Sequence, residues 1–353
     1  MVTRTPDYYA DFHCLAGGCP DTCCGQWEIV VDPAAKARYD SVPGPLGEQI
    51  RAALTTVDGE DCMVLVNGRC PLLTADGLCP IVAQLGEDFL STTCHTHPRF
   101  TEIYGGLAET MLSVSCPEAA RLLLEREAPL TFITGTDEQP PEPNDLDGTL
   151  VHILLESRET AFALVQDRSR PLADRLALLL CFAQRLDQHY DDDRLCRQFS
   201  ALYCDPNYQQ RQLARIRRLR LPHSRSIHPL QELLQSMEHL SAQFPAQIDR
   251  MKAVSPNSIA LEQLSVYFLF RWWLKAACSG YIWRQAAVVV VSVLAVASLT
   301  ENLGDVQLAA RLYSKEVEHS ESNMDLLRKA MDLPQFSRNA LLNQLTQEVP
   351  HAI

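Results

Sequence analysis

The chain has 353 residues, of which 46% are hydrophobic, and it carries a formal net charge of −13 with a pI near 5.2. This length allows two ordinary domains, and the apolar fraction is what a packed core requires, so extensive disorder is excluded. The acidic balance argues against a surface that binds nucleic acid phosphates. An arginine-rich run from Arg211 to Arg225 is the exception, and on an acidic protein it is more typical of a solvated helix face or a partner contact. No nucleic acid partner is expected.

Two features predict where the protein works. The first ten residues include Arg4, Pro6 and Asp7 and contain no apolar run of the length that a secretory signal needs. The most apolar stretch, residues 286–299, is shorter than the roughly 20 residues that span a bilayer. We therefore expect a buried helix or strand there, no membrane partner, and a cytoplasmic protein.

The distribution of prolines and glycines predicts three regions. Before residue 132 these residues recur every few positions and aliphatic runs are short, so a bound metal would supply organisation that a small core does not. Residues 135–148 combine three prolines and five carboxylates with no apolar run, which predicts a linker. We therefore expect a cysteine-rich metal domain at residues 1–132, an acidic Pro-rich linker at 133–149 and a mainly helical domain at 150–353.

The pattern after the linker is helical. Apolar residues recur at spacings of three to four from Val151 to Val165 and from Leu172 to Leu186, which predicts two amphipathic helices. Further helices are expected at residues 230–243, 259–277 and 306–331, and through the apolar stretch. The predicted fold class is therefore mainly α with a loop-rich, cysteine-rich, metal-binding N-terminal domain.

Thirteen cysteines are not expected to form disulfides, because a reducing cytoplasm keeps thiols open. Nine lie before residue 117, and most stand beside Gly, Pro or Asp, the turn residues that let a loop aim several sulfur atoms at one point. The predicted metal ligands are Cys14, Cys19, Cys23, Cys24, Cys70, Cys79, Cys94 and Cys116. The remaining five are expected to be small buried hydrophobic residues: Cys62, Cys181, Cys196, Cys204 and Cys278.

The spacing of the cysteines bears on the metal. None of the spacings is C-x2-C, the arrangement typical of all-cysteine zinc sites, whereas a 4Fe-4S cluster accepts more varied spacing. Iron-sulfur is therefore favoured, with zinc as the alternative. Adjacent Cys23 and Cys24 need a tight turn, or one ligand and one buried thiol, or two metal sites. His95 and His97 could also ligate, but loop histidines are more often hydrogen-bonded to backbone or water.

The cysteine-bearing motifs together resemble those of a known family. They are Cys14, Cys19, Cys23-Cys24-Gly25-Gln26-Trp27, Cys70, Gly77-Leu78-Cys79, Cys94 with Pro98-Arg99, and Ser115-Cys116-Pro117. They are similar to motifs of the flagellin lysine-N-methylases and of the wider cysteine-rich group classed as zinc- or iron-chelating. Near the other end, RLYSKEVEHS from Arg311 to Ser320, with Asn323, resembles the closing helix of the same family and points to its methylase branch.

The resemblance implies a protein-lysine N-methyltransferase that moves methyl groups from S-adenosylmethionine to lysine side chains of flagellin, with a 4Fe-4S cluster or zinc as cofactor. The chain lacks an obvious glycine-rich loop of the Rossmann type. It also lacks the C-x3-C-x2-C spacing usual in radical enzymes that use this donor, so polar transfer is favoured, with a structural or redox-sensing cluster. The alternatives are a non-catalytic iron-sulfur or zinc protein with a redox or scaffold role, and an enzyme whose cluster does redox chemistry.

Polar transfer requires a neutral lysine amine and groups that handle its proton. If the C-terminal motif is one helix, Glu316 and His319 share a face and form a carboxylate–imidazole pair one turn apart. Without the resemblance, a surface helix face would be the better interpretation of this pair. Tyr313 lies on the neighbouring face, which is more typical of core. The catalytic candidates are therefore Tyr313, Glu316 and His319.

Aromatic residues provide the cofactor-binding candidates, which are Trp272, Trp273 and Tyr281. Their rings could hold adenine or the cationic sulfonium of the donor, although such residues are more often core. The active site is expected between the two domains, where ligand sites are common.

Overall fold

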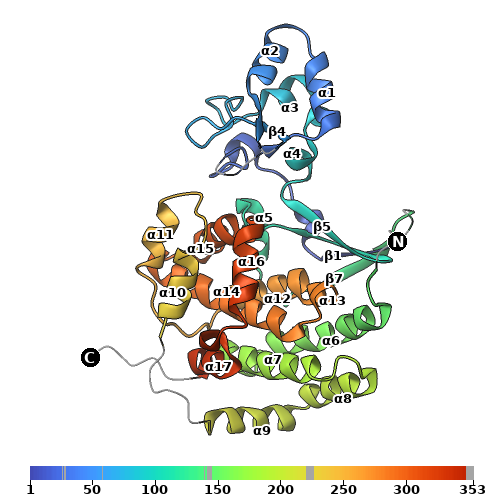
Figure 1. The fold of residues 1–353 in the computed structure, drawn as a ribbon, viewed down its shortest axis with the longest axis vertical. Coiled ribbons are helices and arrows are strands. Elements are labelled where there is room, and N and C mark those ends of the chain that lie inside the picture. Colours follow the sequence, from blue (N-terminus) through green and yellow to red (C-terminus); the bar gives the residue numbers. More distant parts are fainter. Residues whose placement is uncertain are drawn as a thin grey trace.

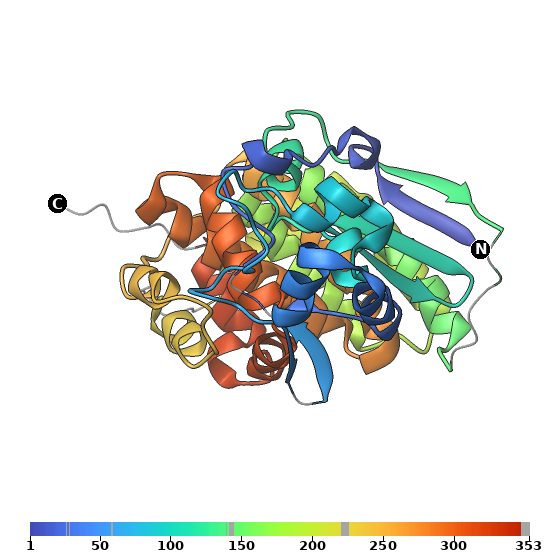
Figure 2. The same ribbon diagram turned by 90° about the horizontal axis from the view of Figure 1, so that it is seen from above.

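The computed structural model describes residues 1–346 except 26, 28, 58, 139, 141–144 and 220–225. Figure 1 shows a smaller lobe above a larger body of helices, and Figure 2, seen from above, shows this lobe over the middle of the body. Each part has its own hydrophobic core. The smaller core runs from Ile29 to Ile81, and the larger core draws on residues from Tyr8 to Leu345.

The smaller lobe consists of a three-stranded antiparallel sheet and four short helices. The strand order is β2 (Ile29–Val30), β4 (Glu60–Met63), β3 (Leu54–Val57), and the helices are α1 (Pro33–Ser41), α2 (Gly44–Ala52), α3 (Pro80–Leu85) and α4 (Thr92–Thr96). Asp32 caps α1 by accepting a hydrogen bond from Ala35 N at 2.9 Å, and its other oxygen accepts one from Thr92 N at 2.7 Å. One carboxylate thus ties α1 to α4.

A four-stranded sheet lies against the helical body. Its order is β5 (Arg99–Tyr104), β6 (Leu107–Leu112), β1 (Val2–Pro6), β7 (Phe132–Thr136). β1 runs parallel to β6 and antiparallel to β7, with Val2 opposite both Leu107 and Thr136. The predicted linker at 133–149 therefore begins as a strand, because β1 supplies backbone partners that local composition does not reveal. Residues 139 and 141–144 of that linker lie outside the described residues.

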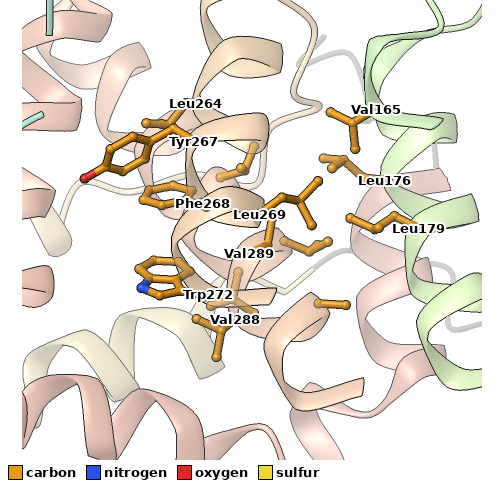
Figure 3. Close-up of a cluster of buried hydrophobic side chains, with 14 of the residues drawn as sticks. Val165, Leu176, Leu179, Leu264, Tyr267, Phe268, Leu269, Trp272, Val288 and Val289 are labelled. Carbon is orange, nitrogen blue, oxygen red and sulfur yellow. The ribbon is translucent and has the colours of Figure 1, made fainter. Parts of the chain in front are cut away.

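The helical body is organised around α14 (Ile282–Leu303), in which every residue from Gln285 to Leu299 is buried. It packs against α7 (Leu172–Asp187), α12 (Ile259–Trp272) and α15 (Val306–Tyr313). Figure 3 shows side chains of α12, α14 and α7, including Phe268, Val289 and Leu176, meeting in one cluster. Among the described helices α14 alone has the length and apolar character to cross a membrane, but 78% of its apolar window is buried. The prediction of a buried element here is confirmed, as a longer helix.

The remaining helices complete a mainly α body, which confirms that part of the fold class. They are α5 (Pro117–Leu124), α6 (Gly148–Gln166), α8 (Asp193–Cys204), α9 (Pro206–Arg217), α10 (His228–Gln235), α11 (Gln243–Ile248), α13 (Ala276–Ser279), α16 (Glu321–Ala330) and α17 (Arg338–Thr346). The two amphipathic helices predicted directly after the linker are present as α6 and α7.

The prediction of a single helix at 230–243 is wrong, because α10 and α11 are separated by residues 236–242. Tertiary hydrogen bonds hold this break. Glu316 accepts hydrogen bonds from Leu240 N at 2.7 Å and from Ser241 Oγ at 2.9 Å, and Asn323 Oδ1 accepts one from Glu238 N at 2.9 Å. Backbone groups that a helix would have satisfied internally are satisfied by side chains of the C-terminal motif. Similarly, the helix predicted at 259–277 changes from α12 to a short 3-10 turn after Trp272.

A buried ion pair joins the sheet to the helical body. Arg158 of α6 and Glu109 of β6 are both almost inaccessible to solvent and form two hydrogen bonds. Arg158 also donates to the carbonyl oxygen of Phe270 at 3.2 Å. A charge buried this deeply is tolerated only because a partner neutralises it.

Candidate functional site

The C-terminal motif does not form the continuous helix predicted at 306–331. α15 ends at Tyr313, Ser314–Glu318 form a π-helix, and α16 starts after Ser320, whose side chain caps it by accepting from Asn323 N. Short π-helical segments are rare and are frequent at functional sites. This irregular turn releases His319 from the helix, so the expected common face of Glu316 and His319 is not formed.

His319 is held by two buried serines from the segment after β6. Its Nε2 atom lies 2.8 Å from Ser113 Oγ and 3.0 Å from Ser115 Oγ, and the two hydroxyl oxygens are 2.8 Å apart. The direction of each bond depends on the imidazole tautomer. Both serines are buried, whereas His319 is exposed when the whole residue is considered. The imidazole is thus fixed at its Nε2 edge.

Two aromatic side chains of the thiol-rich region cover the His319 ring. Trp27 stacks on it with ring centroids 5.2 Å apart and planes inclined by 30°. His97, which follows α4, lies 5.4 Å from Trp27 and 6.2 Å from His319 between ring centroids. The site therefore lies where residues from the smaller lobe meet the C-terminal motif.

A charged group borders these rings. Asp21 accepts hydrogen bonds from Arg311 and, at 2.6 Å, from the Lys315 ammonium, which lies 5.3 Å from the centre of a Trp27 ring. Partial burial raises the pKa of Asp21, but hydrogen bonds from Lys315, the Thr22 backbone and Arg311 outweigh this and hold it below its usual range. Asp21 is therefore a carboxylate at neutral pH.

Both imidazoles of the site are neutral at pH 7. Desolvation by the surrounding protein, with the charges of Arg271 and Lys315 and the neighbouring His97, lowers the pKa of His319 below its usual range. Burial and Lys315 likewise lower the pKa of His97 to about 4. A neutral imidazole offers one donor and one acceptor, and it adds no positive charge to the site.

A buried ion pair lies beneath His319. Glu318 accepts hydrogen bonds from Arg271 at 2.9 Å and from Tyr267 Oη at 3.0 Å. The Arg271 guanidinium lies 4.0 Å from the centre of the Phe100 ring. Burial raises the pKa of Glu318, and Arg271 opposes that rise. Glu318 is therefore the acidic partner of Arg271, whose positive charge contributes to the lowered pKa of His319.

The eight predicted metal ligands gather in two sets. One set lies at the smaller core, where Cys70, Cys79 and Cys94 pack against apolar side chains, and the other lies at the larger core with Cys116. Cys70 N donates to Cys24 O at 2.7 Å, and the Cys23 and Cys24 thiols hydrogen-bond to each other. Cys24 interacts electrostatically with Cys70, Cys79 and Cys94, and Cys116 interacts with Cys14 and Cys19. Cys23 links the two groups, because it interacts with Cys24 and Cys94 and also with Cys14.

These soft thiol donors suit iron-sulfur or zinc chemistry. Within the described ranges, however, no three His, Cys, Asp or Glu side chains are already placed to hold a metal ion, and none of the cysteines forms a disulfide. The metal centre therefore stays a prediction, which the composition of the donor set supports. The expectation that five other cysteines are buried is wrong for Cys204 and Cys278, which are exposed.

The thiol-bearing segments supply the walls of the His319 site. Asp21 lies between Cys19 and Cys23, Trp27 follows Cys24 by three residues, His97 follows Cys94 by three, and Ser115 directly precedes Cys116. Their side chains are those that surround His319 or Lys315. A metal bound by several of these thiols would therefore hold the segments together.

Comparison with known proteins identifies the family. The sequence model of the FliB lysine N-methylase C-terminal domain matches residues 158–342, slightly more than half of the chain. The chain belongs to this family. Its FliB domain carries Arg311, Lys315 and His319, and the thiol-bearing segments precede it. The resemblance inferred from the motifs is thus confirmed.

Individual relatives agree with this assignment. The chain is 29% identical over 131 residues to the flagellar biosynthetic protein FliU of Salmonella muenchen, covering 35% of this chain and 78% of FliU. It is equally similar, over the same length, to the lysine-N-methylases of Salmonella choleraesuis and Salmonella typhimurium. The match spans a third of the length of those two methylases, 33% of each. No solved structure matches the chain significantly.

Of the predicted catalytic residues in the FliB domain, His319 lies in the site described above. Tyr313 is fully buried, and its hydroxyl lies 2.7 Å from Ser292 Oγ in the core. Glu316 binds the segment between α10 and α11. Both therefore contact structural partners and not the His319 ring.

The three predicted cofactor-binding aromatics do not meet in one place. Trp272 stacks on Phe268 in the core with centroids 4.5 Å apart, and Trp273 donates to Ser157 Oγ at 3.2 Å. Tyr281 is 50% exposed and lies against Arg284. The residues that sequence reasoning missed are Asp21, Trp27, Ser113, Ser115 and Lys315. Trp27, Ser115 and Lys315 lie within the family motifs, and this membership was the sequence signal that could have identified them. Asp21 and Ser113 lie outside those motifs.

Proposed function

We propose that the protein is a lysine N-methyltransferase that uses S-adenosylmethionine, with flagellin as its substrate and its active site around His319. The observation that carries this proposal is a neutral imidazole, fixed by two serines and stacked on Trp27 within the family's motifs. The names of the relatives support lysine methylation and a flagellar substrate. We place the reaction in the cytoplasm, before the substrate is exported.

The charges of the site suit a reaction between two cations. The donor is a sulfonium, and a lysine with an ordinary pKa near 10.4 is almost wholly an ammonium at pH 7. His97 and His319 are neutral, Glu318 offsets Arg271, and Asp21 offsets one of its two basic partners. The face of Trp27 attracts cations without adding a counter-charge. Both reactants therefore meet a surface on which one positive charge of the Arg311–Lys315 pair is left without a counter-charge.

Lys315 has a specific effect on an incoming lysine. A like charge within a few ångströms disfavours the charged form of an amine, so the Lys315 ammonium lowers the pKa of a substrate amine placed beside Trp27. The neutral amine then attacks the methyl carbon, an N–C bond forms, the S–C bond breaks, and the bond electrons stay on sulfur. In the tautomer whose Nε2–H donates to the serines, His319 Nδ1 accepts the hydrogen bond of the amine and directs its proton to solvent.

We further propose that the thiols bind metal, with an iron-sulfur cluster favoured over zinc. Cys24, Cys70, Cys79 and Cys94 are the residues that would hold it, because the last three pack at the smaller core and Cys24 interacts electrostatically with each of them. When bound, the metal would supply a cross-link between segments that bring Asp21, Trp27 and His97 to the site. The same thiol sets also support a second candidate function, a non-catalytic metal protein with a redox or scaffold role.

The test is methyl transfer by anaerobically purified protein, with S-adenosylmethionine and flagellin of the same organism, followed by mass spectrometry. The expected result is methyl-sized mass increments on lysines. His319→Ala is expected to lower the rate by about 10²- to 10⁴-fold, the range for a proton-handling group, whereas Tyr313→Phe is expected to keep most of it. No increment from metal-replete wild type would favour the non-catalytic metal protein. Equal rates for His319→Ala and wild type would show that His319 takes no part in the reaction.

A further inference from the structure

We propose, on the basis of the function proposed above, that Asp21 is a positioning residue for this reaction. Its carboxylate ties the thiol-bearing segment to the FliB domain and holds Lys315 and Trp27 against His319. The described partners of Asp21 are Arg311, Lys315 and the Thr22 backbone, and not the His319 ring. Asp21 acts through the two side chains that lie between it and that ring.

Asp21 accepts hydrogen bonds on both of its carboxylate oxygens. One carboxylate oxygen accepts from Arg311 and Lys315, and the other accepts from Thr22 N at 2.8 Å. The side chains of Asp21 and Lys315 are 22% and 8% exposed. Charge-assisted bonds from two cations to one partly buried carboxylate are stronger and more directional than an exposed surface pair. Asp21 therefore fixes a point in a loop that has little regular structure of its own.

Lys315 and Trp27 connect Asp21 to the imidazole of His319. Lys315 and His319 lie in the same irregular turn, and Trp27 contacts both, with its ring 5.3 Å from Lys315 Nζ and 5.2 Å from the His319 ring. Asp21 and Trp27 belong to the same short segment and flank the adjacent thiols Cys23 and Cys24. The segment therefore holds the turn at two places, once by charge and once by ring stacking.

Loss of the Asp21 carboxylate would change both the charge and the contacts of this region. Without it, Arg311 and Lys315 are two adjacent cations that repel each other, and Lys315 loses the acceptor that orients it beside Trp27. Because ring stacking is then the remaining one of the two contacts described between the segment and this turn, we expect Trp27 to leave its stacked position. Misplacement by about 1 Å in an active site can lower the rate by about 10²-fold, even when no catalytic group is lost.

The experiment compares wild type with Asp21→Asn, which keeps the size and removes the charge. Stacking on Trp27 shifts the ring-proton NMR signals of His319, and Trp27→Leu supplies the signals without stacking. We expect Asp21→Asn to move the His319 signals toward those of Trp27→Leu, while other histidine signals stay in place. We expect its methyl transfer to fall about 10²-fold, more than the loss of the Trp27 ring alone, because Lys315 is displaced together with Trp27. Asp332→Asn, which breaks the Arg284 pair at 2.7 Å elsewhere on the body, is the matched control and should change neither readout.

His319 signals that stay at their wild-type positions in Asp21→Asn would overturn the inference. If that variant does not fold, Lys315→Met cuts the same path one step later and should give the same shift; unchanged signals there would overturn it equally. The NMR readout needs no methyl transfer. A wild type that transfers no methyl group would therefore refute the proposed function, while a shift in Asp21→Asn would still support the positioning of the ring.

Discussion

Trp27 and His319 lie ring against ring, although one belongs to the thiol-rich segment and the other to the FliB domain near the end of the chain. Trp27 lies on the face of the imidazole, while Ser113 and Ser115 hold its Nε2 edge. Two motifs far apart in the sequence thus form one arrangement. Changes in either motif should therefore affect the same reaction.

The first prediction concerns the Trp27 ring. Trp27→Ala should lower the rate of methyl transfer by several-fold to about tenfold, because an aromatic pair contributes about 0.5–1.5 kcal/mol beyond its buried area. Trp27→Phe keeps a ring face and should retain most of the rate. Initial rates from mass spectrometry of methylated flagellin measure both. Trp283→Phe, at a partly buried position in the helical body, is the control. Equal rates for the Ala and Phe variants would show that the ring does not act.

The second prediction concerns Gly25, which follows Cys24. A Cβ atom at Gly25 would lie 2.5 Å from the Gly68 carbonyl oxygen, where the two thiol segments form a bridge between Gly25 and Arg69. Gly25→Ala must push these segments apart and separate Cys24 from Cys70. We expect metal affinity, measured by competition with a chelator, to fall about 10- to 100-fold, as for other changes just outside a ligand shell.

Gly18 offers the matched control for this glycine. It lies in the same thiol-rich segment, but a Cβ atom there would meet nothing within 4 Å. Gly18→Ala should therefore bind metal like wild type. If both alanine variants bind metal equally well, the convergence of Cys24 and Cys70 does not form the metal site. Wild-type protein without iron or zinc would contradict the metal proposal itself.

The helices that were predicted correctly have either a periodic pattern of apolar residues or a continuous apolar run in the sequence. The three-to-four spacing of Leu172 to Leu186 gave α7, and the apolar run gave α14. The strands were missed because their burial does not alternate clearly. β1 is exposed or half-buried from Val2 to Thr5 and owes its conformation to pairing with β6 and β7. Local sequence does not encode a partner that lies more than a hundred residues away.

Of the site residues, the sequence predicted those whose role could be inferred from their own motif. His319 was recognised in its motif, but its partners depend on how the smaller lobe lies on the FliB domain. The assumption of a regular helix also failed, since the π-helix at Ser314–Glu318 turns Glu316 toward the break between α10 and α11. Trp272 and Trp273 show the opposite case. Their aromatic rings suggested a site for adenine or the sulfonium, and in the structure both rings are buried in the core.

The third prediction concerns the buried pair that joins the sheet to the helices. Glu109→Gln should destabilise the protein by about 3–5 kcal/mol, because it leaves the Arg158 charge buried without its counter-charge. Urea unfolding at pH 7 measures this free energy. The double variant Glu109→Leu/Arg158→Met should recover most of the loss, since no uncompensated charge remains. Arg328→Gln, which breaks an exposed pair with Asp325, should change stability by less than about 1 kcal/mol. A comparably small effect of Glu109→Gln would mean that water reaches Arg158.

The last prediction concerns pH and Asp32, which holds α1 and α4 together in the smaller lobe. Hydrogen bonds from Thr92 N and Ala35 N lower its pKa from 3.8 to about 2. Since the folded-state pKa lies below the unfolded one, the ionic stabilisation is fully present above about pH 4 and is lost as the pH falls toward 2. Asp32→Ala should lower the free energy of unfolding by about 0.5–2 kcal/mol at neutral pH, as loss of a helix cap does.

The difference between wild type and Asp32→Ala, measured by chemical unfolding from pH 7 to pH 2, should stay constant down to about pH 4 and then shrink. Asp32→Asn keeps an acceptor for the Ala35 amide but carries no charge, so its stability relative to Asp32→Ala should not vary with pH. Because all other titrating groups are shared, they cancel in both differences. A wild-type difference that is the same at pH 7 and pH 2 would show that the carboxylate charge does not hold α1 to α4.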